Sequence, residues 1–211
     1  MLDIESKNDV LMADLLPNVR QANKRKFSNA RGDQRISVPQ FAGATIRLRN
    51  NQMIFNEGDE VRHFYKLMAG RVRLCKVRCN GRRQIIELLI PGDIFGFEFS
   101  AEYPLIAEAA GKVVLERYPF HQIERLSEGR PDVPRYLMTL LQRNLSAVQN
   151  HMVMLGRQTA KERVAAFLAS FAVRLDITRS GVIDLGVARQ DVADYVGLAL
   201  ETVSAGAIIR H

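Results

Sequence analysis

A change of hydrophobic period near Pro131 is the feature that most constrains how this chain can fold. Before it, between about residues 45 and 120, short alternating stretches are separated by turn residues, which is the pattern of β-strands. After it, apolar residues recur at the spacing of an α-helix. Strands that are followed by helices, rather than alternating with them, are typical of an α+β protein. We therefore expect a β unit and a helical unit in this chain of 211 residues.

The first unit contains a well-marked hairpin. In "GRVRLCKV" the pattern places Val72 and Leu74 on the inner face and arginines such as Arg73 on the outer face. Asn80 and Gly81 follow, and this dipeptide is a strong signal for a two-residue turn because both positions take positive φ. "RQIIELLI" supplies the return strand, "PGD" the next turn and "GKVVLERYPF" a further strand. Several short strands at this spacing predict a sandwich or jelly roll.

The helical stretch after Pro131 carries a narrow apolar stripe. Its members alternate between spacings of four and three residues, as in a coiled-coil seam. They are Leu141, Leu145, Val148, Met152 and Leu155. Such a stripe is buried either by a second copy of the helix or by the rest of its own domain. We expect a homodimer, because the stripe continues along a long helix that joins the two units.

The last third of the chain contains three shorter helical patterns. "TAKERVAAFLASFAVRL" has a broad apolar face, and "ITRSGVIDLGVA" predicts a short strand or turn after it. "RQDVADYV" predicts a short helix that Gly197 ends, and "LALETVSA" begins another. A helix, a turn that contains glycine and a second helix are the arrangement of a helix-turn-helix.

The balance of charge favours a polyanionic partner. The formal net charge is +7 at pH 7. Eight basic residues and one acid lie between Arg20 and Arg49, whereas residues 157–211 hold seven basic and six acidic residues. The excess therefore lies in the polar N-terminal stretch, which we expect to form a loose, solvated arm.

Several classes of protein are disfavoured by the sequence. No stretch is apolar and long enough to span a membrane, and the N-terminus lacks the apolar block of a signal peptide, so we expect a cytoplasmic protein. Cys75 and Cys79 are expected to be packing residues of one strand, too far apart for a disulfide. The histidines are scattered, and no nucleophile, phosphate-binding or dinucleotide fingerprint is present. We expect no metal, no cofactor and no enzymatic activity.

Three motifs resemble those of the Crp/Fnr transcription regulators. "FNEGDEVRHFYKLMAGRVRL" and "PGDIFGFE" are similar to turns of the family's β-barrel, and "RQDVADYVGLALETVS" is similar to its DNA-binding signature. The similarity covers roughly residues 45–204 and is nearest to the rhizobial FixK and FnrN branch. It implies an N-terminal extension at 1–40, a cyclic-nucleotide-binding-like β jelly roll at 41–126, a long dimerisation helix at 127–156 and a winged helix-turn-helix at 157–211.

The resemblance also implies a function. Regulators of this family bind a two-fold symmetric site in double-stranded DNA as homodimers and contact RNA polymerase, and the FixK branch controls genes of microaerobic respiration and nitrogen fixation. Members that bind cyclic AMP carry a Gly-Glu and an Arg-Ser pair. Here Glu98 is displaced by one position, and the stretch from Leu105 to Glu108 holds no arginine, so a cyclic phosphate would face Glu108. We therefore expect no bound cyclic nucleotide.

By the same resemblance, the second helix of the motif enters the major groove. Glu201 and Ser204 match positions that contact bases, and a glutamate can accept a hydrogen bond from cytosine. Arg189, Gln190 and Thr202 match positions that contact phosphates. Without the resemblance, Glu201 is equally explained as a carboxylate that the helix dipole favours near a helix start.

Three residues depart from the family pattern in this second helix. Ala199 stands where a capping threonine or serine is usual, Ala205 replaces an arginine, and Gly206 lies inside the helix. The sequence also ends at His211, before the rest of the helix and the β-wing of relatives, so we expect a truncated helix-turn-helix domain. One hypothesis is a shifted reading frame after Ser204. The alternative function is then a product that dimerises but binds DNA poorly, and acts as a negative regulator or not at all.

Overall fold

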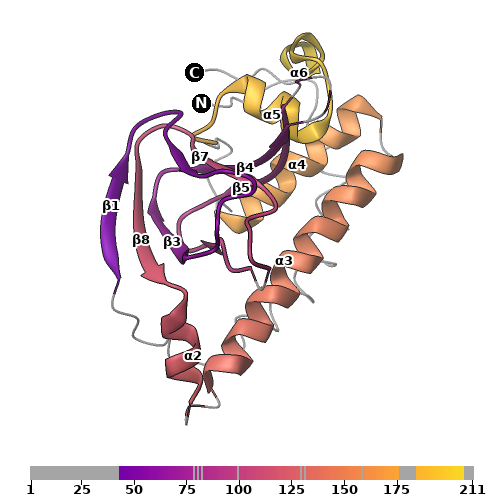
Figure 1. The fold of residues 1–211 in the computed structure, drawn as a ribbon. Coiled ribbons are helices and arrows are strands. Elements are labelled where there is room, and N and C mark those ends of the chain that lie inside the picture. Colours follow the sequence, from indigo (N-terminus) through magenta and orange to yellow (C-terminus); the bar gives the residue numbers. More distant parts are fainter. Residues whose placement is uncertain are drawn as a thin grey trace.

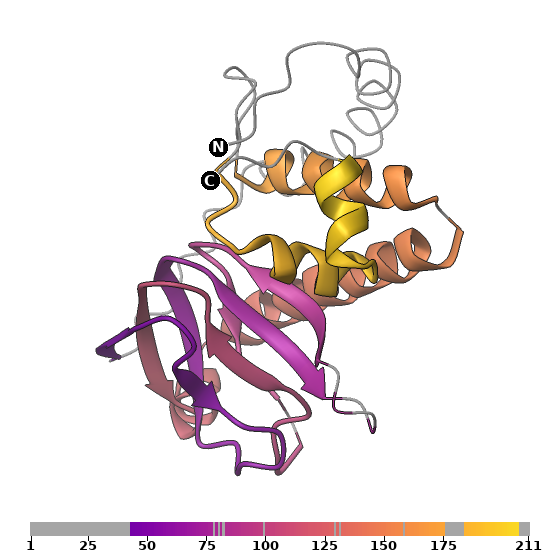
Figure 2. The same ribbon diagram turned by 90° about the horizontal axis from the view of Figure 1, so that it is seen from above.

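The computed structural model describes residues 43–77, 79, 81, 83–98, 100–128, 130, 132–157, 159–175 and 184–206. A β sandwich comes first, a long helix follows, and shorter helices lie beside the sandwich (Figure 1; Figure 2). This is the α+β architecture that the change of period predicts. The N-terminal extension, Asn80 and the last residues from 207 to 211 lie outside the described residues.

Two four-stranded sheets form the sandwich. One has the order β1 (Ala44–Leu48), β8 (Val113–Pro119), β3 (His63–Ala69) and β6 (Ile94–Phe95). The other has the order β2 (Met53–Phe55), β7 (Ile106–Ala109), β4 (Val72–Val77) and β5 (Arg83–Leu89). Every neighbouring pair is antiparallel. The pairing of distant strands such as β1 and β8 gives the jelly roll that the sequence predicts.

The β4–β5 hairpin forms at the predicted place, with a loop longer than two residues. β4 ends at Val77 and β5 begins at Arg83, and Gly81 has the expected positive φ of 74°. Cys79 lies in this loop and is exposed, whereas Cys75 lies in β4 and is buried. The expectation of both cysteines in one strand is therefore wrong. Both thiols are free, and burial raises the pKa of the Cys75 thiol to about 12.

Five helices follow the last strand in the described part of the chain. They are α2 (His121–Ser127), α3 (Asp132–Arg157), α4 (Ala160–Arg174), α5 (Arg189–Val196) and α6 (Leu200–Gly206). A capping box begins α4: the Thr159 backbone N–H donates to the Glu162 carboxylate at 2.7 Å, and the Thr159 hydroxyl accepts from the Glu162 N–H. This pattern of threonine and glutamate three residues apart sets the turn between α3 and α4.

The largest apolar core joins the sandwich to the helices. It contains residues of β4, β5 and the following turn together with residues of α3, α4, α5 and α6. Among its members are Cys75, Ile85, Leu88, Met154, Phe167, Val192, Val196 and Val203. A second core lies between the two sheets, and a third lies around α2 and the first half of α3. The helical unit therefore packs directly on the sandwich, in addition to being joined to it through α3.

Candidate nucleic-acid interface

The described residues 189–206 form the predicted helix-turn-helix. Gly197 ends α5 in the left-handed conformation, with φ 68° and ψ 40°, and its N–H donates to the Ala193 carbonyl. A β-carbon at Gly197 would lie 3.3 Å from the side chain of Leu155. Both the positive φ and this close approach favour glycine, so Gly197 fixes the angle at which α6 leaves α5.

One face of this motif is seated in the core and the other is open. The buried apolar side chains are Val192, Ala193, Val196 and Val203. Glu201, Thr202 and Ser204 are exposed on α6. Because α6 packs on α4 and α5, it lies on the side of the helical unit away from the strands (Figure 1; Figure 2). The three polar side chains can therefore approach the edges and backbone of a nucleic acid.

The two predicted phosphate contacts on α5 lie at its first turn. Arg189 is half-buried and Gln190 is exposed. The Gln190 side-chain amide donates to the Asp194 carboxylate at 2.7 Å, so a phosphate would compete with this bond for the same N–H groups. The structure thus brings Arg189 and Gln190 to one helix and Glu201, Thr202 and Ser204 to the next, and their contacts with DNA stay predictions.

The two helices begin after alanines that offer no side-chain acceptor. The Ala188 N–H donates instead to the carboxylate of Asp191, three residues later, at 3.3 Å. The Ala199 carbonyl accepts from the N–H groups of Thr202 and Val203, at 3.1 and 3.2 Å. α5 therefore keeps one half of a capping box, in which the Asp191 carboxylate serves the backbone of Ala188, whereas Ala199 supplies no side-chain acceptor at the start of α6.

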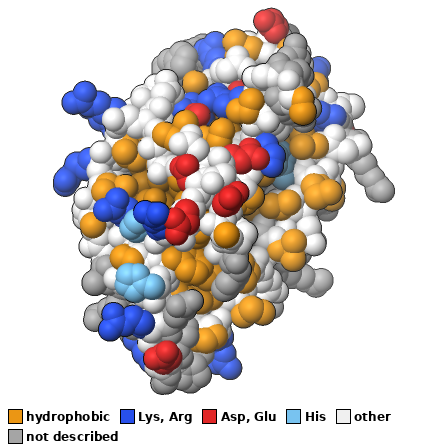
Figure 3. Space-filling view, in the orientation of Figure 1, with side chains coloured by type: hydrophobic (Ala, Val, Ile, Leu, Met, Phe, Trp, Pro, Cys, Tyr) orange, Lys and Arg blue, Asp and Glu red, His pale blue; other side chains and the backbone are white. Residues whose placement is uncertain are grey.

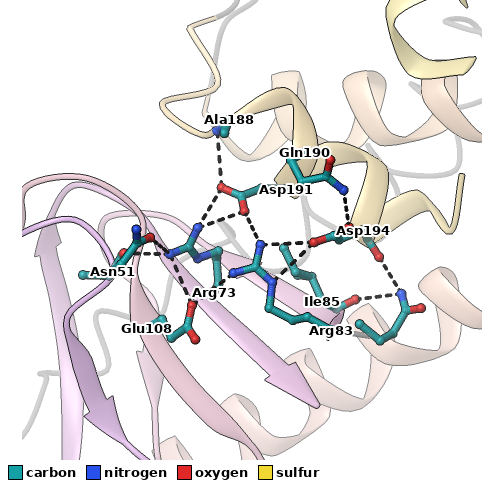
Figure 4. A network of polar contacts seen from close by, with 11 residues as sticks. Asn51, Arg73, Arg83, Ile85, Glu108, Ala188, Gln190, Asp191 and Asp194 are labelled. Atoms are coloured by element: carbon teal, nitrogen blue, oxygen red, sulfur yellow. Dashed lines mark hydrogen bonds and ion pairs between the residues drawn. The ribbon is translucent and has the colours of Figure 1, made fainter. Parts of the chain in front are cut away.

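A cluster of two arginines and three carboxylates joins the sandwich to α5 (Figure 4). Arg73 donates to both carboxylate oxygens of Asp191, at 2.9 and 3.2 Å, and lies 3.2 Å from Glu108. Arg83 donates to Asp191 at 3.0 Å and to Asp194 at 3.1 Å, and it also lies 3.2 Å from Glu108. These five residues form the interdomain cluster.

Arg73 departs most clearly from the sequence prediction. The alternation of β4 predicts an exposed arginine, yet its side chain is only 6% exposed, because α5 covers this face. It also donates to the Asn51 side chain at 2.7 Å and to the Ala109 carbonyl at 3.1 Å. The resemblance placed Glu108 where a cyclic phosphate, had one been bound, would meet it. Its neighbours Ala107 and Ala109 belong to the core between the sheets, whereas Glu108 pairs with the arginines of the interdomain cluster.

His151 links three elements beside this cluster. It is buried on α3, with Nδ1 3.0 Å from the Ile86 carbonyl of β5 and Nε2 2.8 Å from the Tyr195 carbonyl of α5. Its ring stacks on that of Tyr195 at a centroid distance of 4.0 Å. Both partners are backbone carbonyl oxygens, so the ring connects the backbones of β5 and α5. The Gln84 amide adds a bond of 2.6 Å to the Asp194 carbonyl.

A half-buried carboxyl group lies on the same side of the sandwich. Burial raises the pKa of Glu87 on β5 to about 7, although the positive charge of Arg174 opposes the shift. Arg174 reaches from α4 to the sandwich, where it donates to the Asp93 carboxylate at 2.6 Å and the Leu88 carbonyl at 3.0 Å. Burial raises the pKa of Tyr195 to about 12, and the charge of Glu87 adds to this shift. The junction with α5 therefore contains a group that titrates near neutral pH.

The predicted stripe on α3 divides into two parts. Its first and last members, Leu141 and Leu155, are half-buried and pack against apolar clusters of their own chain. The members between them are exposed, Leu145 by 59% and Met152 by 67%. Met138, which the sequence analysis missed, is also 67% exposed and lies seven residues before Leu145. Apolar side chains accordingly show along α3 on the face drawn in Figure 3.

Two family models match this chain. The cyclic nucleotide-binding domain matches residues 45–129, and the bacterial regulatory proteins of the crp family match residues 185–204. A nitrogen fixation regulation protein FixK of Bradyrhizobium diazoefficiens is 38% identical over 164 residues, which cover 77% of this chain and 69% of that protein. The chain belongs to the Crp/Fnr family. The resemblance that its three motifs predict is thus confirmed.

Further relatives of this Crp/Fnr chain have similar coverage. The FixK protein of Rhizobium meliloti is 34% identical over 151 residues, covering 72% of this chain and 67% of the relative. The solved structure of FixK2 from Bradyrhizobium japonicum aligns with a TM-score of 0.74 and 33% identity, covering 78% of this chain and 82% of that one. The chain spans about two thirds of the length of these curated relatives. The jelly roll followed by the long helix is therefore the fold of this family.

The described residues hold no group of three or more histidine, cysteine or acidic side chains placed to bind a metal ion. Among the helices described, none combines the length and the apolar character that crossing a bilayer requires.

Proposed function

We propose that this chain binds double-stranded DNA and regulates transcription, with nitrogen-fixation and microaerobic-respiration genes as its targets. The observation that carries the proposal is that α6 has one buried face and one exposed, polar face. Val203 seats it in the core, while Glu201, Thr202 and Ser204 face solvent on a helix that can fit a major groove. The names of the FixK relatives support the class of target genes.

A homodimer is the second part of the proposal. Met138, Leu145 and Met152 repeat every seven residues and are each more than half exposed, which is unusual for large apolar side chains in a row. A second copy of α3 would cover them. Such a dimer presents two α6 helices to successive turns of DNA, about 34 Å apart, and so matches a two-fold symmetric site. Contact with RNA polymerase follows from the family and completes the role of a regulator.

The sandwich supports control without a bound cyclic nucleotide. Four aromatic rings occupy the space between its sheets: Phe55 stacks on Tyr103 at 3.8 Å, and Tyr65 stacks on Phe95 at 5.3 Å. Glu108 is engaged by two arginines, and no arginine of the 105–108 stretch is there to bind a phosphate. We infer that the amount of the protein, rather than a small effector, sets its activity.

A second function is favoured by the composition of α6. Ala199 provides no cap, and the helix ends with Ala205 and Gly206, which bring no cation to a base edge. A chain with these residues can dimerise through α3 and still bind DNA weakly. Paired with a longer relative, it would then act as a negative regulator.

DNA binding separates the two functions. Fluorescence anisotropy would compare a palindromic TTGAT–ATCAA duplex with a scrambled duplex at several salt concentrations. The proposed regulator binds the palindrome at micromolar concentration or below, with an affinity that falls as salt rises. Replacing Glu201 by Ala should reduce discrimination between the duplexes by about 5- to 100-fold. The absence of salt-sensitive binding would leave only the dimerisation role.

Sedimentation tests the dimer independently of DNA. The wild-type chain should sediment as a dimer, and Leu145→Glu should convert it to a monomer by placing a charge in the exposed stripe. Asn150→Glu is the matched control, since it adds the same charge at an exposed position on another face of α3. A wild-type chain that sediments only as a monomer refutes the homodimer.

A further inference from the structure

The interdomain cluster grips the start of the helix-turn-helix. Asp191 is the third residue of α5, and its carboxylate accepts from the Ala188 N–H as well as from both arginines. Its side chain is only 3% exposed. The first turn of α5 is thus completed by side chains of the sandwich, which holds the helix by its N-terminal end.

The sandwich presents its two arginines as a preformed pair. Arg73 and Arg83 come from the neighbouring strands β4 and β5, and both lie 3.2 Å from Glu108 on β7. All three strands belong to one sheet, whose backbone hydrogen bonds fix the positions from which these side chains extend. They match two carboxylates on α5, Asp191 and Asp194, which are three residues apart and lie on one face of the helix.

The position of α5 in turn decides the position of α6. The two helices share the Gly197 turn, and Val196 and Val203 lie in the same core. In this arrangement the inner pair of the interdomain cluster, Arg73 and Asp191, is covered, while Glu201 and Ser204 on α6 are exposed. An arrangement in which α5 is docked on the sandwich and the polar face of α6 is exposed is the one expected of a molecule that can bind DNA.

We propose that Arg73 and Arg83 are positioning residues for DNA binding, which hold α5, and through it α6, in the DNA-competent pose without a bound effector. The proposal rests on the proposed DNA-binding function. It assigns to fixed side chains of the sandwich the role that a ligand would otherwise have, and it names the pairs with Asp191 and Asp194 as the contacts that matter.

A double-mutant cycle tests the outer pair. Arg83→Gln and Asp194→Asn are studied singly and together, because these side chains are 29% and 16% exposed and tolerate replacement better than the buried pair. Anisotropy with the palindromic duplex is expected to show a loss of affinity of about 5- to 50-fold for each single variant, and no larger loss for the double variant. Arg73→Gln extends the test to the inner pair.

A second measurement separates positioning from general damage. Amide hydrogen exchange should speed up in α5 and α6 of Arg83→Gln, while the strands from β1 to β8 keep their protection. Arg62→Gln is the matched control. It removes the same charge and an ion pair with Glu60 from an exposed site of the sandwich, and it should change neither affinity nor exchange.

The outcomes are distinct. If the wild-type chain does not bind the duplex, the proposed function fails, and exchange alone then decides whether the arginines position α5. If the wild type binds and Arg83→Gln and Arg73→Gln bind equally well, with unchanged exchange, the positioning role is overturned. A gain of affinity in these variants also overturns it, since the cluster would then hold an inhibited pose.

Discussion

The two helices of the DNA-binding motif are similar in length and differ in how they are held. α5 is fixed at both ends: Asp191 and Asp194 meet the arginines of the sandwich, and the Tyr195 carbonyl meets His151. α6 has Val203 as its one fully buried side chain among those described. The helix that would contact bases is therefore the less supported of the two, and it depends on α5 for its position.

The departures from the family pattern lie in the less supported helix. The replacements at Ala199, Ala205 and Gly206 all fall in or next to α6, whereas the contacts that dock α5 are complete. We expect weak support at α6 to reduce DNA affinity without unfolding the domain. Such a chain would keep its fold and its exposed stripe on α3 while losing part of its affinity for DNA.

The largest effect on the docking of α5 is expected from Arg73→Ala. It removes one of the two cations that contact the buried carboxylate of Asp191 and the half-buried carboxylate of Glu108, which costs up to about 3–5 kcal/mol in the free energy of unfolding. Urea unfolding followed by circular dichroism measures this loss. Arg62→Ala, at an exposed ion pair, should leave the unfolding midpoint where it is. Equal midpoints for Arg73→Ala and wild type would mean that the buried pair does not stabilise the docked helix.

Two valines provide a matched test of the helices themselves. Val196 in α5 and Val203 in α6 are both fully buried. Val196→Ala should lower the free energy of unfolding by about 2 kcal/mol, because α5 is part of the cooperative core. Val203→Ala should lower it by less, since α6 can fray on its own, yet it should weaken DNA binding more. Urea unfolding and anisotropy on both variants test this, and the reverse order would show that α6 is the better held.

The dependence of stability on pH tests how the junction with α5 responds to titration. The pKa of Glu87 is about 7 in the folded chain and 4.5 in an unfolded one. Between these values the folded chain binds more protons, so the free energy of unfolding falls as pH rises through this window. A full shift of this size corresponds to about 3 kcal/mol, and we expect about 1–2 kcal/mol because the residue is only half-buried.

Unfolding of the wild type and Glu87→Gln at pH 5 to 8 isolates this effect. The variant should gain stability at pH 8 relative to the wild type, and the gain should shrink towards pH 5. Asp132 and Glu162 have lowered pKa values and act in the opposite direction at lower pH, so the difference between the two proteins is the quantity to plot. A difference that stays flat across this range would contradict the assignment to Glu87.

The smallest expected effect comes from adding caps. Ala199→Ser should stabilise α6 by about 1 kcal/mol and raise DNA affinity a few-fold, because the serine supplies the missing acceptor. Ala188→Ser should add less, because the Asp191 carboxylate already serves the start of α5. Thermal unfolding and anisotropy would compare the two. A larger gain at Ala188 would show that α5 is the less well capped helix.

Much of the fold could be predicted from the order of the residues. Alternation and turn dipeptides located the strands, and Gly81 and Gly197 marked turns whose positive φ few other residues adopt. The long α3 followed from the recurrence of apolar residues every three or four positions, and α5 followed from its one buried face and the glycine that ends it. The capping box of Thr159 and Glu162 was also readable from the sequence but was overlooked.

The joint between the units could not be predicted in this way. Alternation tells which side of a strand Arg73 occupies, but it does not tell whether water or another domain covers that side. Asp191 and Asp194 look like ordinary helix carboxylates in the sequence, and their partners lie more than 100 residues away. The exposure of Met138 likewise depends on where α2 and the sandwich stop covering α3.

The largest core draws its members from β4 and β5 as well as from all four of the last helices. Heating should therefore melt the barrel and the DNA-binding helices together, as one calorimetric peak. Domains that swing freely on a linker melt in separate steps. Here a single substitution at Ile85, deep in the barrel wall, should be felt by the helices as a drop in the same melting temperature.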